Sequence, residues 1–180
     1  MLTESRRIAR MRLVEEHVGC ENRHDLEGVL STFGRGAFYD DEPWNDRRDG
    51  HAQVRAYYEA LMRAVPDLEI DVQRRHVTDD RIILEVIIRG THLAEWRGLP
   101  ATGRRVNVPL CGIYDFDEDD RIERETIYYD RATVLQQLGV FHDPQTITGK
   151  IVTALTHPLT IARIAMRKAV PNRSGGSSFR

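Results

Sequence analysis

The chain has few cysteines and no long hydrophobic run. Its 180 residues contain no apolar stretch of the roughly 18 residues that a membrane-spanning helix needs, and the polar N-terminus lacks a signal-peptide core. Cys20 and Cys111 lie far apart in segments that we expect to pack, so we expect both to be reduced and inert. These features predict a cytoplasmic protein.

Several common catalytic motifs are also missing. The sequence has no Gly-x-Ser-x-Gly elbow, no glycine-rich phosphate loop, no His-Glu-x-x-His and no Cys/His cluster. No metal or cofactor is therefore predicted, and an enzyme built from this chain would work by cofactor-independent proton transfer. The net charge of −2 gives no basic field for nucleic-acid phosphates, so nucleic acid is not an expected partner.

The first third of the chain has helical periodicity. Hydrophobic residues make up 41% and charged residues 30% of the sequence, a balance typical of soluble globular proteins. Apolar residues recur every three to four positions, and Asp25 precedes the second run as a candidate N-cap. The pattern predicts helices over residues 4–22, 26–33 and 49–65, with a polar loop over 40–49.

After Pro66 the pattern changes to the two-residue period of half-buried strands. Gly90 is expected to form a bulge or bend in the longest strand. The acidic run 117–120 is most simply a solvated hairpin turn, with a divalent-metal site as the alternative. Strands are predicted over residues 68–73, 81–96, 106–116 and 121–130, followed by a helix over 132–138 that Gly139 ends.

The last forty residues are expected to lie outside the main domain. We predict a domain over residues 1–140, a helical extension over 141–173 and a disordered Gly/Ser-rich tail over 174–180. Basic and apolar residues in the extension favour packing against the domain or a second subunit. Peripheral contact with a membrane surface is the alternative.

Six short segments, taken in order, resemble the SnoaL-like polyketide cyclase (ester cyclase) group of the nuclear-transport-factor-2-like superfamily. The resemblance covers about residues 5–140. It implies an α+β fold, a cone-shaped and curved mixed or antiparallel sheet covered by N-terminal helices, and pairing of sheets into a homodimer. The segments are ENRHDL (21–26), GHAQV (50–54), AVPDL (64–68), GTH (90–92), GLPATGR (98–104) and Asp130 before LQQLG (135–139).

The resemblance implies that Asp130 is the acid/base residue, since cyclases of this group have an aspartate near the end of the last strand. A carboxyl group at the wall of an apolar cavity has a raised pKa, which suits proton transfer. The alternative is that Asp130 caps the helix that follows it. His92 could donate or accept a hydrogen bond at a substrate oxygen, or be satisfied by the following loop.

Strict alternation from Asp130 places Tyr128 on its face of the last strand and Glu125 on the other. Tyr128 is therefore the predicted substrate contact, and Glu125 a weaker acidic candidate that a bulge would bring in. Trp44, Tyr57 and Trp96 are further candidate pocket residues, although aromatic residues at such positions also serve as ordinary core.

Two functions fit these features. The first is a cyclase or isomerase that moves protons on an apolar, carbonyl-bearing molecule of polyketide-like or steroid-like type, with Asp130 as base and His92 or Tyr128 as hydrogen-bond partner. The second is a protein that binds a hydrophobic small molecule without converting it. The same fold serves both kinds of protein, so the site has to decide between them.

Overall fold

The computed structural model of the chain describes residues 3–161 and 163. The chain divides into two compact units, Met1–Val140 and Phe141–Arg180, and each is described by itself. The first unit contains a six-stranded sheet, three helices that cover it and a short helix after the last strand.

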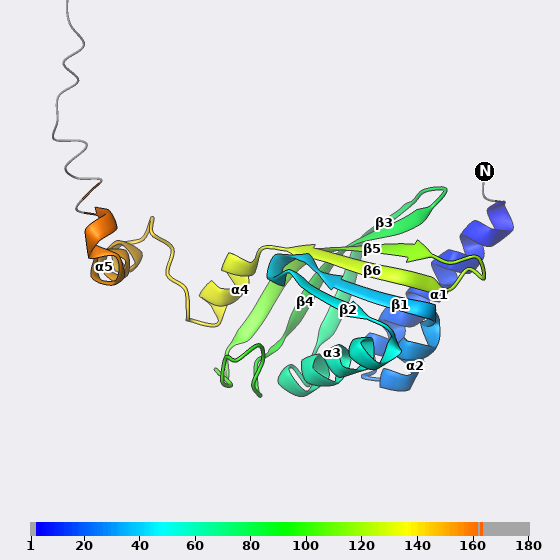
Figure 1. Ribbon diagram of the computed structural model, residues 1–180, viewed down its shortest axis with the longest axis horizontal. Coiled ribbons are helices and arrows are strands. Elements are labelled where there is room, and N and C mark those ends of the chain that lie inside the picture. The colour runs from blue at the N-terminus through cyan, green and yellow to red at the C-terminus, as the bar shows by residue number, and fades with distance from the viewer. Residues whose placement is uncertain (1–2, 162, 164–180) are drawn as a thin grey trace, which may run out of the picture. The chain divides into compact units, whose positions relative to one another are not determined.

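The sheet is mixed, curved and open (Figure 1). Its strands lie in the order β2-β1-β6-β5-β4-β3, and all neighbours are antiparallel except β1 and β6, which are parallel. The predicted fold class, α+β with a curved mixed sheet and N-terminal helices, is confirmed. The strands are β1 (Phe33–Asp41), β2 (Asp46–Asp49), β3 (Glu69–Val77), β4 (Arg81–Thr91), β5 (Arg105–Phe116) and β6 (Ile122–Tyr129).

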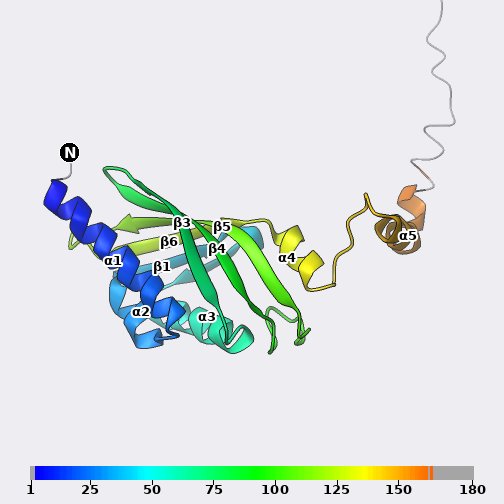
Figure 2. The same cartoon turned by 180° about the vertical axis from the view of Figure 1, so that it is seen from behind.

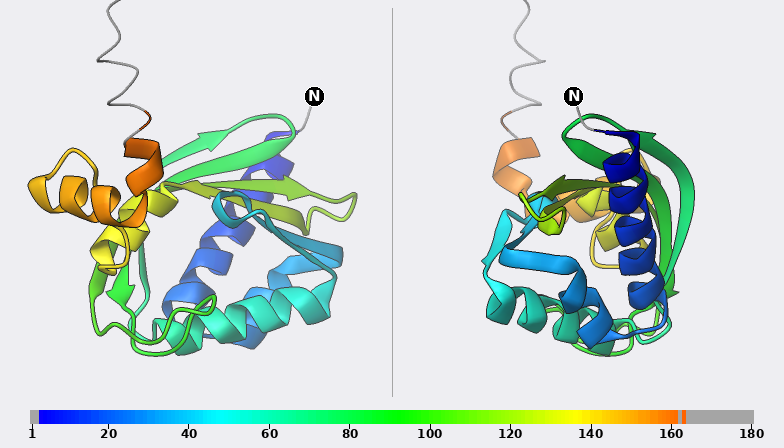
Figure 3. Two further views of the ribbon diagram at one scale, coloured as in Figure 1. Left: turned by 60° about the vertical axis from the view of Figure 1, so that its left-hand side comes forward. Right: turned by 90° about the vertical axis from the view of Figure 1, so that its right-hand side faces the viewer.

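The helices gather on one side of the sheet (Figures 2 and 3). The long helix α1 (Glu4–Asn22) contacts β3, α2 (Leu26–Thr32) contacts α1, and α3 (His51–Ala64) contacts β1 and β2. The predicted N-cap is present, since the Asp25 carboxylate accepts a hydrogen bond from the Gly28 N–H at 2.9 Å. A one-turn 3₁₀ helix, η1 (Glu42–Trp44), joins β1 to β2, and α4 (Arg131–Gln137) follows β6.

The core lies between these helices and the inner face of the sheet. The period-3.6 positions of α1 and α3 and the period-2 positions of the strands meet there, so the sequence pattern and the packing agree. Burying each such aliphatic side chain contributes roughly 1.5–3 kcal/mol. Fully buried members are Val14, Val29, Val54, Ile82, Leu84 and Ile122.

The N-terminal half of α1 is tied to the acidic turn between β5 and β6. Asp120 accepts hydrogen bonds from the Nε atoms of Arg6 and Arg10, each at 2.6 Å. The turn predicted as simply solvated therefore also anchors a helix, because its carboxylate faces two guanidinium groups.

Residues 33–41 form a strand where the sequence suggested the end of a helix and a loop. Gly34 and Gly36 locally favour a helix stop, but the buried alternation of Ala37, Tyr39 and Asp41 is that of a strand. This strand is fixed by parallel pairing with β6, which lies more than eighty residues away in sequence. Local periodicity does not report such long-range pairing.

Two details of β4 also differ from the prediction. The strand ends at Thr91, so residues 92–104 form a loop. Its pairing with β5 continues without interruption through Gly90, so Gly90 makes no bulge. A Cβ at this position would instead overlap Cγ1 of Val65, so glycine is required by close packing against the segment after α3.

The second unit contains α5 (Ile147–Thr156), which is helical as predicted for this region. The Thr146 hydroxyl accepts a hydrogen bond from the Gly149 N–H at 3.0 Å and caps the helix, which ends at Thr156 with His157 as its C-cap before Pro158. The predicted tail over 174–180 and most of the basic segment lie outside the described residues. Among the helices that the structure describes, none has the length and apolar character needed to cross a bilayer.

Candidate functional site

The first unit contains a partly open cavity of about 130 Å³ between the inner face of the sheet and the helices. Most of its wall is apolar and comes from alternate residues of the central strands, among them Val86, Ile88, Val108, Leu110 and Ile127. The polar part of the wall is small. It consists of the side chains of Glu21, His92 and Glu125 and the tyrosines Tyr39, Tyr57, Tyr114 and Tyr129.

The alternation of β6 decides which of its residues reach the cavity. Glu125, Ile127 and Tyr129 line it, whereas Tyr128 points to the other face and is 47% exposed. The predicted alternation was therefore right, but the face chosen for the site was wrong for Tyr128. Glu125, predicted as the weaker candidate, lies at the cavity wall without any bulge at its position.

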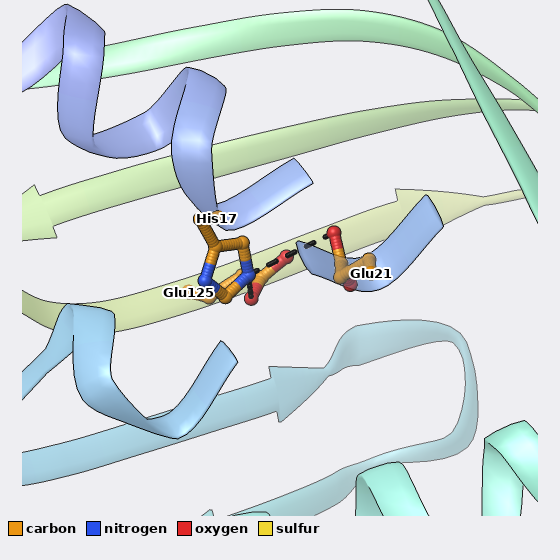
Figure 4. Close-up of side chains that lie close together, drawn as sticks. All are labelled: His17, Glu21 and Glu125. Carbon is orange, nitrogen blue, oxygen red and sulfur yellow. Dashed lines mark hydrogen bonds and ion pairs between the residues drawn. The ribbon is translucent and has the colours of Figure 1, made fainter. Parts of the chain in front are cut away.

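Two carboxyl groups and one imidazole lie close together (Figure 4), and both carboxyl groups belong to residues of the cavity wall. His17 and Glu21 lie one turn apart on α1, and Glu125 comes from β6. The His17 Nε2 atom is 3.1 Å from Glu125 Oε2 and 3.7 Å from Glu21 Oε2. All three residues are buried, so the carboxyl–imidazole cluster lies in a low-dielectric environment.

The hydrogen bonds of His17 fix its protonation. The Thr32 hydroxyl donates to the Val29 carbonyl, so it accepts from His17 Nδ1 at 2.7 Å. With a proton on Nδ1, a second proton on Nε2 is favoured by the facing Glu125 oxygen. Burial lowers the pKa of His17, but the charges of Glu125 and Glu21 outweigh it and raise that pKa overall. The two neighbouring carboxyl groups thus favour the imidazolium form of His17.

Glu21 and Glu125 have different surroundings. Burial, helped by the charge of Glu125 and opposed by His17, raises the pKa of Glu21 to about 8. Glu125 Oε2 accepts hydrogen bonds from the Tyr58 hydroxyl at 2.7 Å and from His17 at 3.1 Å. Paired carboxyl groups in unequal environments can serve as proton donor and proton acceptor within one site.

His92 lies in the cavity wall with one ring nitrogen free. The Thr102 N–H donates to His92 Nδ1 at 3.3 Å, which leaves the proton of the neutral ring on Nε2. That Nε2 atom is buried and has no hydrogen-bond partner among the described residues. The loop after β4 thus fixes His92 as a donor at the wall of an otherwise apolar cavity.

The three aromatic candidates have different positions. Tyr57 and Trp96 line the cavity, and their rings are 5.5 Å apart in an edge-to-face arrangement. Trp44 is not among the described lining residues. Its ring lies between the guanidinium groups of Arg97 and Arg131, each 5.0 Å from the ring centre.

Asp130 caps a helix instead of lining the cavity. Its Oδ1 accepts a hydrogen bond from the Ala132 N–H at 2.8 Å, and its Oδ2 accepts one from the Thr133 hydroxyl at 2.6 Å. These bonds, that of Thr133 first, lower the pKa of the exposed Asp130 carboxyl. The cavity-wall position predicted for Asp130 is therefore corrected, and the capping alternative describes its geometry.

His17 and Glu21 were missed at the level of sequence. Both belong to the buried stripe of α1 that contains Val14 and Val18, at the spacing of one helix face. Titratable residues on an otherwise apolar helix face are the available signal, because burying them requires partners. Glu125, their partner, could not be assigned in this way because it comes from the far end of the domain.

Comparisons with known proteins agree with this architecture. A family model described as SnoaL-like polyketide cyclase matches residues 11–138. AclR from Streptomyces galilaeus, named as a candidate hydroxylase, is 24% identical with a TM-score of 0.65, over 75% of this chain and 98% of its own. The comparison with curated proteins gave no match.

Two further solved structures share the fold. A Catenulispora acidiphila protein with a ketosteroid isomerase-like fold, solved with trimethylamine, is 16% identical with a TM-score of 0.60, over 71% of this chain and 92% of its own. SalBIII, an epoxide hydrolase/cyclase-like enzyme of pyran ring formation in salinomycin, is 17% identical with a TM-score of 0.59, over 68% and 92%. These likenesses are to the fold. The family match over residues 11–138 shows that the chain belongs to the SnoaL-like polyketide cyclase family.

Proposed function

We propose that the protein is a cofactor-independent cyclase or isomerase that transfers protons on an apolar, carbonyl-bearing small molecule. One observation carries the proposal. Glu21 and Glu125, both close to His17, line an apolar cavity that His92 also lines, and His92 Nε2 has no hydrogen-bond partner among the described residues. An apolar wall selects a hydrophobic ligand, and the few polar groups set its orientation.

The roles follow from the environments of the groups. Glu125 accepts a proton from the carbon next to a carbonyl, and the electron pair of the broken C–H bond moves onto the carbonyl oxygen. His92 Nε2–H donates a hydrogen bond to that oxygen as its charge develops. His17, held by Glu125 and Thr32, stabilises the negative charge of Glu125 before Glu125 takes the proton.

The enolate then has two outcomes. In an isomerisation, a different carbon of the same molecule takes back the proton. In a cyclisation, the enolate carbon forms a bond to a second carbonyl carbon, and the resulting alkoxide takes a proton from Glu21, whose raised pKa keeps it protonated at neutral pH. His17 then gives its Nε2 proton to Glu21 and takes the proton held by Glu125, which restores all three groups. Asp130 takes no part in either route.

The size of the cavity guides the choice of a probe. At about 130 Å³ it is close to the roughly 150 Å³ cavity that holds one benzene ring. A small cyclic ketone such as cyclopentanone, which is about as large as benzene and has exchangeable hydrogens next to its carbonyl, therefore suits the site. Its hydrogens can be followed by NMR as they are replaced in D₂O.

The experiment measures the rate of this deuterium exchange with wild-type protein and with variants. We expect Glu125→Gln to lower the catalysed rate by roughly 10²–10⁴-fold, the usual contribution of a positioned acid or base. Asp130→Asn is the matched carboxyl-to-amide control, and we expect it to retain the wild-type rate. Loss of exchange in Asp130→Asn together with full exchange in Glu125→Gln would return the catalytic role to Asp130.

A second candidate function is binding without conversion, favoured by how fully the cluster is hydrogen-bonded. Both nitrogens of His17 and one oxygen of Glu125 already have protein partners, as in a structural polar network. The same samples separate the two functions. Chemical-shift changes of bound cyclopentanone without catalysed exchange would support a binding protein and contradict the enzyme.

A further inference from the structure

The loop over residues 92–104 supplies two residues to the cavity wall, His92 and Trp96. It connects β4 to β5, and its tip is a two-residue hairpin. The N–H groups of Trp96 and Leu99 donate to each other's carbonyl oxygens at 3.0 and 2.9 Å. The contacts that hold this tip in place therefore also determine the positions of Trp96 and His92.

The tip has an unfavourable residue at its first turn position. Arg97 has φ +54° and Gly98 has φ +78°, the left-handed pair of a type I′ turn. Such turns favour Asn-Gly, because asparagine and glycine adopt this conformation most readily. Turn preference alone does not explain an arginine at this position, so the contacts of its side chain must favour it.

The Arg97 side chain reaches from the loop to two carboxylates on other strands. Its Nη2 is 2.6 Å from Asp41 Oδ2 at the end of β1, and its Nη1 is 2.7 Å from Asp46 Oδ2 at the start of β2. The guanidinium also lies 5.0 Å from the Trp44 ring centre and 4.9 Å from that of Trp96. A third ring, that of Tyr57, has its centre 5.8 Å from the guanidinium. Two ion pairs and three cation–π contacts therefore join at one side chain.

Asp41 links this group to the cavity. It is fully buried, and the hydroxyls of Tyr57 and Tyr129, both cavity-lining residues, donate to its Oδ2 at 3.4 and 3.3 Å. Movement of Arg97 away from Asp41 would leave a buried carboxylate without its cation. Breaking one side of a buried ion pair is strongly unfavourable, so the closed position of the loop is favoured.

We infer that Arg97 is a positioning residue that latches the loop 92–104 onto β1 and β2 and thereby holds His92 and Trp96 in the cavity wall. The role of His92 as a donor to the ligand rests on the proposed function. The latch itself does not, and it is tested without any ligand. Failure of the latch would leave the roles of Glu21 and Glu125 untouched.

The first test is backbone hydrogen–deuterium exchange of the segment 92–104 in Arg97→Asn. The substitution makes the favoured Asn-Gly turn but removes the Arg97 contacts. If turn preference held the loop, exchange would slow; if the Arg97 contacts hold it, exchange becomes faster. We expect exchange about tenfold faster than in wild type. Equal or slower exchange would overturn the inference. Arg131→Ala is the control, because it removes the other cation on Trp44, and we expect its exchange to stay within about twofold of wild type.

The second test uses the only two tryptophans of the chain, both of which flank Arg97. We expect Arg97→Asn to change the intrinsic fluorescence, and millimolar methylguanidinium to restore both the spectrum and the slow exchange by refilling the site between Asp41 and Asp46. Urea, a neutral molecule of similar shape, should restore neither. Equal effects of the two additives would contradict a site for the guanidinium cation.

Arg97→Lys covers the case in which Arg97→Asn fails to fold by circular dichroism. Lysine keeps the charge but has no planar fork to reach two carboxylates at once. We expect exchange of the loop at a rate between those of wild type and a latch-free protein. Wild-type protection in the lysine variant would show that the two-carboxylate fork is not required and would contradict the latch as described.

Discussion

Glu21 and Asp130 are two carboxyl groups of one domain in opposite environments. Glu21 is buried at the cavity wall, where burial raises its pKa to about 8. Asp130 is exposed, and its bonds to Thr133 and to the Ala132 N–H lower its pKa. Glu21 can exchange a proton near neutral pH, whereas Asp130 stays ionised there and stabilises a helix end.

Closeness to a family motif did not distinguish these two residues. Asp130 precedes the segment 135–139 that carries part of the resemblance, and Glu21 belongs to the resembling segment 21–26. What separates them is the side chain's surroundings, which depend on how α1 packs against β6. Removing the groups that create each environment should therefore have different effects on stability and different dependence on pH.

The largest effect is expected from His17→Leu. This change removes the cation between Glu21 and Glu125 and leaves two carboxyl groups buried together, so we expect a loss of about 3–5 kcal/mol in the free energy of unfolding at pH 7. Urea denaturation measures it. His76→Leu is the matched control, since His76 pairs with Glu85 at the surface, and it should cost less than about 1 kcal/mol. Similar losses in both variants would mean that the buried cluster stabilises the folded state no more than a surface ion pair does.

The next effect is a change in how stability depends on pH. A glutamate has a pKa of about 4.3 in an unfolded chain, while Glu21 has one of about 8 in the folded protein. Between these values the folded state binds more protons, so Glu21 makes stability fall as pH rises. We expect Glu21→Gln to flatten that fall, giving a gain relative to wild type at pH 8, on the order of a few kcal/mol, that shrinks toward pH 5.

Urea denaturation of both proteins at a series of pH values measures this difference. His17, whose pKa is also raised, contributes stability that is present below its unfolded pKa and lost as pH rises through its folded pKa. Some slope should therefore remain in the variant. Parallel pH profiles for wild type and Glu21→Gln would show that Glu21 titrates as an ordinary exposed carboxyl group.

The elements with strong local signals could be predicted from the sequence. The helix over residues 4–22 and the strand over 106–116 follow from their apolar periodicity, and the Asp25 cap follows from its position before an apolar run. Each of these depends on residues close together in the chain. The strand β1 was missed because parallel pairing with β6 defines it, while its two glycines locally suggest a break.

The site was harder to predict for the same reason. His17 and Glu125 are 108 residues apart, and only the folded sheet brings them to 3.1 Å. Alternation correctly placed Glu125 and Tyr128 on opposite faces of β6, but alternation does not say which face is inside. The sequence prediction chose the face of β6 that alternation assigns to Asp130. Asp130, however, lies just beyond the strand and caps α4, so its direction does not report the inner face of β6.

The smallest effect is expected from Asp130→Ala. The change removes the acceptor for the Ala132 N–H and the Thr133 hydroxyl, and loss of a cap should lower the melting temperature by about 2–4 °C near neutral pH. Because the pKa of Asp130 is lowered, its stabilising effect is present above its unfolded pKa and is lost as pH falls through the folded one. The difference from wild type should therefore shrink in acid. The difference for Glu21→Gln also shrinks in acid but has the opposite sign, because that variant is the more stable protein at higher pH. Melting curves at acidic and neutral pH measure this, and a difference that widened in acid would show that Asp130 is not a carboxylate cap.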